Sequence, residues 1–239
     1  DKGMKKSRIA TLIVFFVLIP LTLIVGSRLS GRAFYVTSTL VIVELLIPFF
    51  LAFEGRRPQA RELVVLAVMC ALAVAGRVAI PIPSFKAIFG IIMIAGIAFG
   101  PESGFLVGAI SALASNFFYS QGPYTPWQMM AYGAGGMLAG FVFAEGRLPR
   151  KPVVMGIFGF LAVAFFVGPL LDTCSVFLVM SRISLKGAMA FYISGFPVNL
   201  RQAVATAIVL LVLGKPLLEK LDRIKTKYGI LDDEGRKEA

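Results

Sequence analysis

Asn116-Phe-Phe-Tyr-Ser-Gln-Gly-Pro-Tyr-Thr-Pro-Trp-Gln128 is a polar and aromatic loop in the middle of a long apolar stretch, Lys86 to Gly146. Between the terminal charges Lys86 and Glu145, the only full charge in that stretch belongs to Glu102. Amides, an indole and two phenols therefore lie where two apolar segments meet. Aromatic faces supply stacking area and amides fix orientation, so this composition predicts a pocket for an uncharged or weakly charged organic solute.

The composition of the whole chain extends the apolar pattern. Its 239 residues are 58% hydrophobic and 15% charged, with a mean hydropathy of +0.85. Soluble domains carry about 25% charged residues and shorter apolar runs. Helices satisfy every backbone hydrogen bond within lipid, so the sequence predicts an all-α integral membrane protein. It leaves no room for an ATP-hydrolysing domain, and any ATP-driven transport would need another chain.

Eight apolar segments can be distinguished, and a membrane crossing needs about 20 helical residues. They lie near residues 9–27, 34–53, 62–80, 87–100, 103–119, 126–144, 153–181 and 187–214. Segment 87–100 is short for a crossing, but a short helix can persist where its neighbours bury it. The turn Gly100-Pro101-Glu102 makes it antiparallel to the next segment. Kinks are expected at Gly168-Pro169 and at Gly195-Phe-Pro197 in the two long segments.

The distribution of Lys and Arg predicts the orientation. With eight crossings and both termini cytoplasmic, 17 of the 24 basic residues fall on the inner side, six fall outside, and Arg201 remains in the membrane. This bias agrees with the positive-inside rule. It places the loops 81–86, 119–125 and 182–186 on the outer face, so a pocket there opens outward.

Several kinds of chemistry are disfavoured by the composition. The chain has no His, and its two Cys residues, Cys70 and Cys174, lie inside separate apolar runs. The usual general base and metal ligands are therefore missing, and no catalytic residue, metal site or resident cofactor is predicted. The net charge of +11 is explained by cytoplasmic loops, so no nucleic-acid partner is expected.

The loop supplies most of the candidate binding residues. The amide and aromatic members are Asn116, Tyr119, Gln121, Tyr124, Trp127 and Gln128. Trp and Tyr are also common in the aromatic belt at a membrane interface. The three amides and two prolines favour a binding loop over a plain belt.

Charged residues in or near apolar segments are the second set of candidates, because a buried charge is costly unless it is paired or wetted. Arg77 and Lys86 flank helix ends and could extend to the interface instead. Glu44 could pair with an Arg for assembly, and Asp172 could pair with Arg201. Arg201 is flanked by Asn199 and Gln202, and it is the best of these charged residues for a ligand contact. Asn199, Arg201, Gln202 and Lys86 are all predicted to contact the ligand.

Two surfaces are candidate contact sites. Ala67-x-x-x-Ala71-x-x-x-Ala75 is a stripe of small residues that would let another helix approach closely, either a partner's helix or one of this chain's own. The tail 216–228 carries apolar residues at helical spacing among basic ones. It is predicted to be an amphipathic helix on the inner leaflet.

The order of these motifs resembles that of the substrate-binding (S) component of energy-coupling factor (ECF) vitamin transporters. The resemblance rests on the alanine stripe, Ile80-Pro-Ile-Pro-Ser-Phe-Lys86, Ile91-Ile-Met-Ile-Ala-Gly-Ile-Ala-Phe-Gly-Pro-Glu-Ser-Gly-Phe-Leu-Val-Gly-Ala109, Ser115-Asn-Phe-Phe118 and Gln121-Gly-Pro-Tyr-Thr-Pro-Trp-Gln-Met129. It covers about residues 62–230. The loop is most similar to a subgroup associated with cobalamin, although Pro197-Val-Asn-Leu-Arg-Gln202 departs from the Pro-x-Asp-x-x-His-like pattern of relatives.

The resemblance implies a fold and partners. Residues 61–215 would form the six-helix binding core, 1–60 an extension of two helices, and 216–239 a cytoplasmic tail. Ala67, Ala71 and Ala75 would face the transmembrane scaffold subunit, which joins two ATPases in a bacterial cell membrane. The S component would topple to deliver its vitamin. That vitamin is expected to be cobalamin, with riboflavin or another flat vitamin or precursor as the alternative.

Two other classes of function are less consistent with the sequence. A membrane-embedded lipid-modifying enzyme would need a cluster of carboxylates, a metal set or a nucleophile with a base, and Glu44 and Asp172 are far apart in sequence. A ligand-free assembly subunit would leave the aromatic and amide loop without a role. Both are weaker than a transport subunit that is not itself an enzyme.

Overall fold

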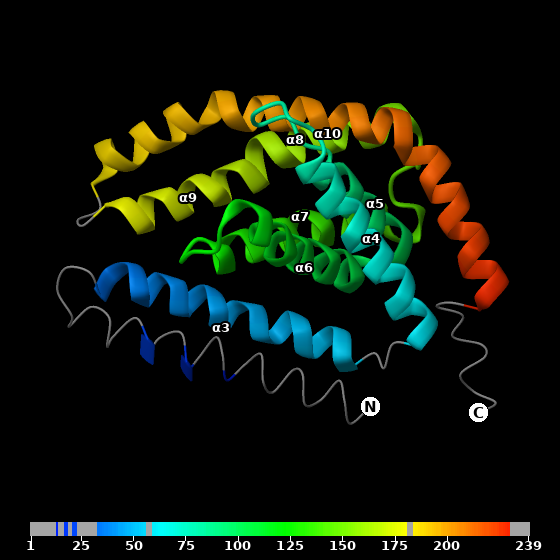
Figure 1. Cartoon of the computed structure of the whole chain (residues 1–239), viewed down its shortest axis with the longest axis horizontal. Helices are drawn as coiled ribbons and strands as arrows, with labels where there is room; N and C mark the ends of the chain where they lie inside the picture. The colour runs from blue at the N-terminus through cyan, green and yellow to red at the C-terminus, as the bar shows by residue number, and fades with distance from the viewer. Residues whose placement is uncertain are drawn as a thin grey trace.

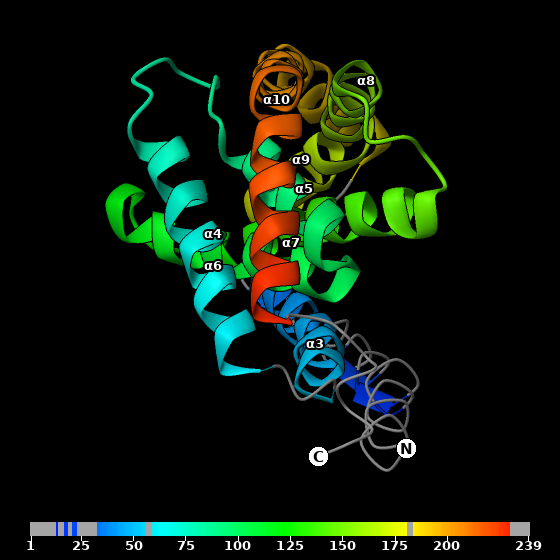
Figure 2. The same ribbon diagram turned by 90° about the vertical axis from the view of Figure 1, so that its right-hand side faces the viewer.

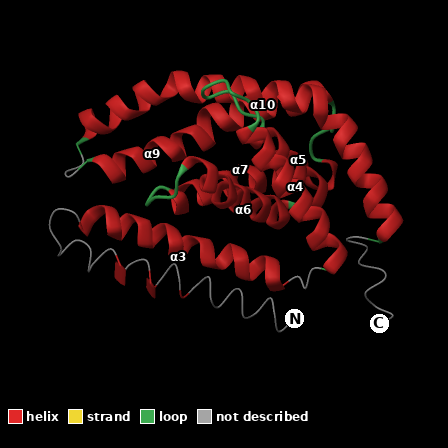
Figure 3. Ribbon diagram, in the orientation of Figure 1, coloured by secondary structure: helices red, strands yellow, loops and turns green. Residues whose placement is uncertain are grey.

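The computed structural model describes residues 13, 17–18, 21–22, 33–55, 59–180 and 184–229. Within these ranges every regular element is helical and no strand occurs (Figure 3). The all-α prediction is therefore confirmed for the described part. Most of the predicted first segment, 9–27, lies outside the described residues.

The helices follow the predicted apolar segments from residue 34 onward. They are α3 (Ala33–Gly55), α4 (Ala60–Val78), α5 (Ile88–Phe99), α6 (Pro101–Tyr119), α7 (Thr125–Phe143), α8 (Pro152–Ala162), α9 (Gly168–Val179) and α10 (Leu185–Tyr228). Among the described residues, two continuous helices are long and apolar enough to cross a membrane. One is α10, and the other, Pro152–Val179, joins α8 and α9 through the turn Val163–Val167. This finding supports a membrane protein, and the prediction of eight crossings stays a prediction.

Helix α5 is the centre of the bundle. All twelve of its residues are buried, and it packs against α4, α6, α7 and α10. At about 1.5 Å per residue it is far shorter than the ~30 Å hydrocarbon core. The expectation that this short segment persists because its neighbours bury it is confirmed.

Glycines bring the backbones of α6 and α7 into contact. A Cβ placed on Gly104 would lie 2.5 Å from the carbonyl oxygen of Gly136, and one on Gly136 would lie 2.7 Å from the carbonyl carbon of Gly104. Small residues permit this approach in the absence of a hydrophobic driving force between helices in lipid. The close packing fixes the two helices that carry the 120–124 loop.

The two predicted kink regions behave differently. A π-helical turn, Val163–Val167, directly precedes Gly168-Pro169, where proline removes a backbone donor and crowds the turn before it. By contrast, α10 remains one continuous helix of 44 residues with Pro197 and Pro216 inside it. Its ribbon turns sharply between its orange and red parts (Figure 1).

The predicted tail is part of α10 rather than a separate element. The boundary expected at 215/216 falls inside this helix, which continues to Tyr228. Leu218 and Leu221 are buried in the main core, and Lys225 Nζ donates to the carbonyl oxygen of Ala98 at 2.7 Å. The core of the bundle therefore covers the central residues of this apolar face, and the placement of the tail on the inner leaflet stays a prediction.

Helix α3 covers one side of the core. It packs against α6, α7 and α9 and runs along the lower side of the bundle in Figure 1. Its Glu44 accepts a hydrogen bond from Thr22 Oγ1 at 2.5 Å. In the described residues Glu44 thus contacts a hydroxyl from the N-terminal extension and no Arg.

Candidate ligand-binding site

Asn116 on α6 is the centre of a polar cluster at the end of the bundle where the 120–124 loop lies. Its side chain is fully buried. Asn116 Nδ2 donates to Thr125 Oγ1 at 3.1 Å and to Gln128 Oε1 at 2.8 Å, while its Oδ1 accepts from Arg77 at 2.8 Å. One amide therefore connects α4, α6 and α7 through three of its hydrogen-bonding positions.

Arg77, in the last turn of α4, supplies the charge of this cluster. Its Nη1 donates to Ser115 Oγ at 2.5 Å as well as to Asn116. Its guanidinium carbon lies 5.0 Å from the ring centroid of Tyr119 and 5.6 Å from that of Tyr132. The sequence allowed Arg77 simply to extend to the interface, whereas its side chain turns into the bundle. An Arg at the end of an apolar helix was the only sequence signal for this role.

We use the term polar cluster for the residues joined by these contacts. They are Arg77, Ser115, Asn116, Tyr119, Thr125, Gln128 and Tyr132.

Lys86 and Gln202 adjoin the polar cluster. Gln202 Nε2, on α10, donates to the carbonyl oxygen of Lys86 at 2.7 Å. Lys86 Nζ donates to the carbonyl oxygen of Ile80 and lies 6.0 Å from the ring centroid of Tyr119. The loop between α4 and α5 is thereby tied to α10 beside the cluster. Both residues were predicted to bind ligand, and they lie in one region.

Gln121 and Tyr124 shape the loop itself. Thr125 Oγ1 donates to Gln121 Oε1 at 2.9 Å, and Gln121 Nε2 donates to the carbonyl oxygen of Leu113 at 3.0 Å. Tyr124 donates from its hydroxyl to the carbonyl oxygen of Ser120 at 2.8 Å. These bonds are local, and they hold the turn from α6 into α7 in one conformation.

Trp127 lies in a different environment from Gln128, its neighbour in sequence. Its ring stacks on Phe177 of α9, with centroids 5.4 Å apart, and packs with Ile42 and Cys174. The indole Nε1 is buried and has no hydrogen-bond partner in the described part of the chain. Successive residues of a helix point about 100° apart, so Trp127 faces α3 and α9.

Asn199 and Arg201 lie apart from the polar cluster. Asn199 Nδ2 donates to Asp172 Oδ2 at 2.7 Å, which joins α10 to α9. Arg201 is exposed, and its Nε donates to the carbonyl oxygen of Pro197 at 3.3 Å. The ion pair between Asp172 and Arg201 that the sequence suggested is absent from the described residues, because the shorter Asn199 occupies the carboxylate.

The alanine stripe, Ala67, Ala71 and Ala75, faces outward. All three residues are exposed, while Leu66, Met69 and Ala73 form the buried side of α4. Figure 2 shows α4 along the left edge of the bundle. Packing of the stripe against this chain's own helices, the alternative left open by the sequence, is therefore excluded for the described residues.

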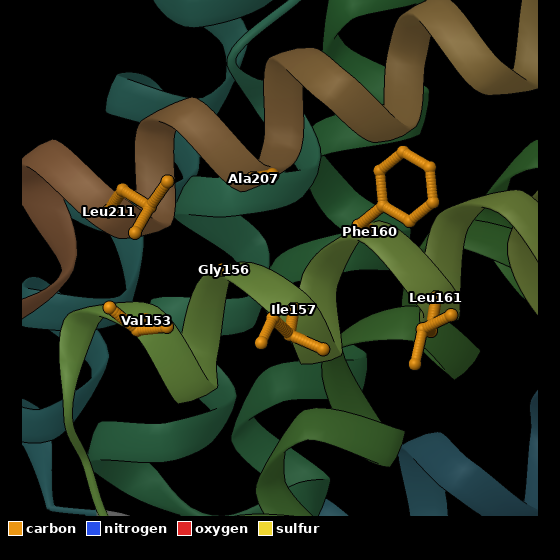
Figure 4. A pocket seen from close by; sticks show the side chains of 7 residues that line it. All are labelled: Val153, Gly156, Ile157, Phe160, Leu161, Ala207 and Leu211. Carbon is orange, nitrogen blue, oxygen red and sulfur yellow. The ribbon is translucent and has the colours of Figure 1, made fainter.

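Two apolar grooves lie away from the polar cluster. One, of about 290 Å³, runs between α8 and α10 and is lined by Val153, Gly156, Ile157, Phe160, Leu161, Ala207 and Leu211 (Figure 4). The other, of about 250 Å³, is lined by Leu72, Ile91, Leu213, Pro216, Leu217 and Lys220. None of the predicted binding residues lines either groove.

The described residues form an all-helical bundle with two helices long enough to cross a membrane and a polar cluster between its helices. A sequence model described as "ECF-type riboflavin transporter, S component" matches residues 58–219, about two thirds of the chain. The chain therefore belongs to the S components of ECF transporters, and the resemblance seen in the sequence is confirmed at that level. No curated protein and no solved structure matches the chain.

Proposed function

We propose that this chain is the vitamin-binding subunit of an ECF importer and that the polar cluster is its binding site. The observation that carries the proposal is that α4 holds Arg77 in the cluster and exposes the alanine stripe along its length. A transport subunit needs both a ligand site and a surface for the energising complex. On α4, the ligand site and the docking surface are formed by different residues, which supports the proposal that one helix contributes to both.

The alanine stripe is the proposed contact with the transmembrane scaffold subunit. Exposed small residues at every fourth position allow a partner helix to approach closely within lipid. Two ATPases bound to that scaffold would supply the energy. The distribution of basic residues supports a multi-pass topology in a bacterial cytoplasmic membrane, with the polar cluster toward the outer side.

The ligand proposed for the site is a flat vitamin or vitamin precursor. The exposed ring of Tyr119 offers stacking surface, and the partly buried amide of Gln128 offers a polar group to orient a ring, while Asn116 holds Gln128 in place. Riboflavin comes first because the matching family is described by that vitamin. Cobalamin, the expectation from the loop sequence, is the second candidate, and without His the chain would bind it by shape and hydrogen bonds alone.

Ligand carried through purification tests the proposal. Mass spectrometry and absorbance on the detergent-purified chain would detect a flavin spectrum for riboflavin or a corrin spectrum for cobalamin. A pull-down from native membranes would test for two ATPases and a scaffold protein. Purified protein with neither a vitamin nor an ATPase partner would contradict the proposed function and would favour a ligand-free assembly role.

A further inference from the structure

Two cationic side chains approach the same aromatic ring in the polar cluster. The Arg77 guanidinium carbon and Lys86 Nζ lie 5.0 Å and 6.0 Å from the ring centroid of Tyr119. Their hydrogen bonds end on neutral acceptors: Arg77 contacts Ser115 and Asn116, and Lys86 contacts a backbone carbonyl. The ring and these acceptors leave the two positive charges uncompensated.

No carboxylate balances these charges within residues 33–55, 59–180 and 184–229. Ion pairs in these ranges include Arg150–Asp222, Lys215–Glu219 and Lys225–Asp222, and none contains Arg77 or Lys86. These three involve α10 residues 215–225, beyond the part of α10 that contacts Lys86. Arg77 lies at the end of an apolar helix, where a charge is retained if it has a partner or a function. An anion from elsewhere would compensate Arg77 and the neighbouring Lys86.

The hydrogen-bonding capacity of Arg77 is also incompletely used. Its Nη1 makes both bonds to the cluster, while Nη2 and Nε make none to the described residues. These two nitrogens form part of the planar fork that binds carboxylate or phosphate oxygens in a bidentate manner. The Ser115 and Asn116 bonds hold the fork in one orientation, which favours a ligand group of fixed geometry.

We propose that the ligand carries an anionic group, a carboxylate or a phosphate, that binds to Arg77 and Lys86 while its ring lies against Tyr119. This inference rests on the proposed function of the cluster as the ligand site. It revises the uncharged or weakly charged solute expected from the loop, because the loop sequence did not reveal that Arg77 joins it. The vitamin would thus enter as its anionic form or as a phosphate ester.

Matched probe pairs test the inference on the purified full-length chain. Each pair shares a ring and differs in charge: riboflavin 5′-phosphate and riboflavin, nicotinate and nicotinamide, biotin and biotinamide. Charge-assisted hydrogen bonds predict that at least one anionic probe binds about 10- to 100-fold more tightly than its neutral counterpart. A preference in the flavin pair identifies a phosphate, and a preference in either other pair identifies a carboxylate.

Variants connect that preference to the two cations. Arg77→Gln and Lys86→Gln are each expected to reduce the ratio of anionic-probe affinity to neutral-probe affinity at least about tenfold. Lys186→Gln, at an exposed position in the first turn of α10, is the matched control and should keep the wild-type preference. Lys86→Gln keeps the test decisive if Arg77→Gln fails to fold, since the Lys86 side chain bonds only to its own loop in the described residues.

Three results would overturn the inference. They are equal or tighter binding of the neutral probe in every pair, a preference that survives both Gln variants, and no binding of any anionic probe. The proposed function is judged separately. Tight binding of neutral riboflavin together with an ATPase pull-down would leave the transport function intact and remove the anionic ligand.

Discussion

The polar end of α4 and its outer face are opposite in character although they belong to one helix. Arg77 is tied into the bundle by Ser115, Asn116 and the ring of Tyr119. The alanine stripe two to ten residues earlier makes an exposed apolar surface with Val64 and Val68 beside it. The contrast teaches that the two roles proposed for α4, ligand binding and partner docking, rest on side chains that do not overlap, so each role is expected to be removable alone.

A bulky substitution in the alanine stripe should give the largest effect, a loss of vitamin uptake. Ala71→Trp places a bulky ring on the proposed docking surface, so uptake of the vitamin should fall to background while binding to the purified chain is unchanged. Transport in whole cells and equilibrium binding measure the two quantities. Val212→Trp, at an exposed position of α10, adds a similar ring elsewhere and should transport normally. Normal uptake by Ala71→Trp would remove the docking role.

Replacement of Asn116 should weaken ligand binding at the polar cluster and leave docking at the alanine stripe unchanged. Asn116→Ala leaves Arg77, Thr125 and Gln128 without a shared partner, at a cost of about 1–3 kcal/mol for each group left unsatisfied. Ligand binding should be lost and thermal stability lowered. The ATPase pull-down should still succeed if the two regions are independent, and its failure would show that the cluster also supports the docking surface.

Loosening the loop between α4 and α5, which lies beside the polar cluster, should reduce ligand affinity by a smaller amount. Gln202→Ala removes the hydrogen bond to the carbonyl oxygen of Lys86, so the loop between α4 and α5 becomes less restrained. One neutral hydrogen bond corresponds to an affinity loss of about 3- to 10-fold. Stopped-flow measurements should show most of the loss as faster dissociation. An unchanged dissociation rate would mean that this loop does not retain the ligand.

The smallest effect is expected at Trp127. Because its Nε1 has no partner in the described residues, Trp127→Phe retains the stacking on Phe177 and loses no hydrogen bond. The free energy of unfolding should change by less than about 1.5 kcal/mol, with ligand affinity preserved. A large loss of affinity in this variant would place the indole N–H on the ligand and extend the binding site toward α9.

Much of the fold was accessible from the sequence because lipid imposes simple rules on helices. The apolar segments from residue 34 to the last one, the turn at Gly100-Pro101 and the burial of segment 87–100 all follow from local composition. The tail from Pro216 onward was less accessible. Its amphipathic pattern is the same whether Leu218 and Leu221 meet lipid or the core, and only the position of α5 distinguishes the two.

The polar cluster could be predicted only in part from the sequence. Asn116, Tyr119 and Gln128 were recognisable as polar residues in an apolar setting. Lys86 and Gln202 were separate candidates, and only the structure places them beside the cluster. The environments of Trp127 and Arg201 were not predictable, since each depends on which side of its helix meets a neighbour. For the same reason Arg77, separated from Asn116 by 39 positions, had no visible link to the loop.

The sequence by itself determined the class of protein, the ECF family and, apart from the C-terminal end of α10, the boundaries of the described helices from residue 33 onward within a few residues, because these depend on hydropathy and on local motifs. Tertiary structure alone decided that Arg77 turns inward and that the alanine stripe turns outward. The physical reason is that a helix fixes the angles between its side chains but not its rotation within the bundle. That rotation is set by close packing around α5 and by the hydrogen bonds of Asn116.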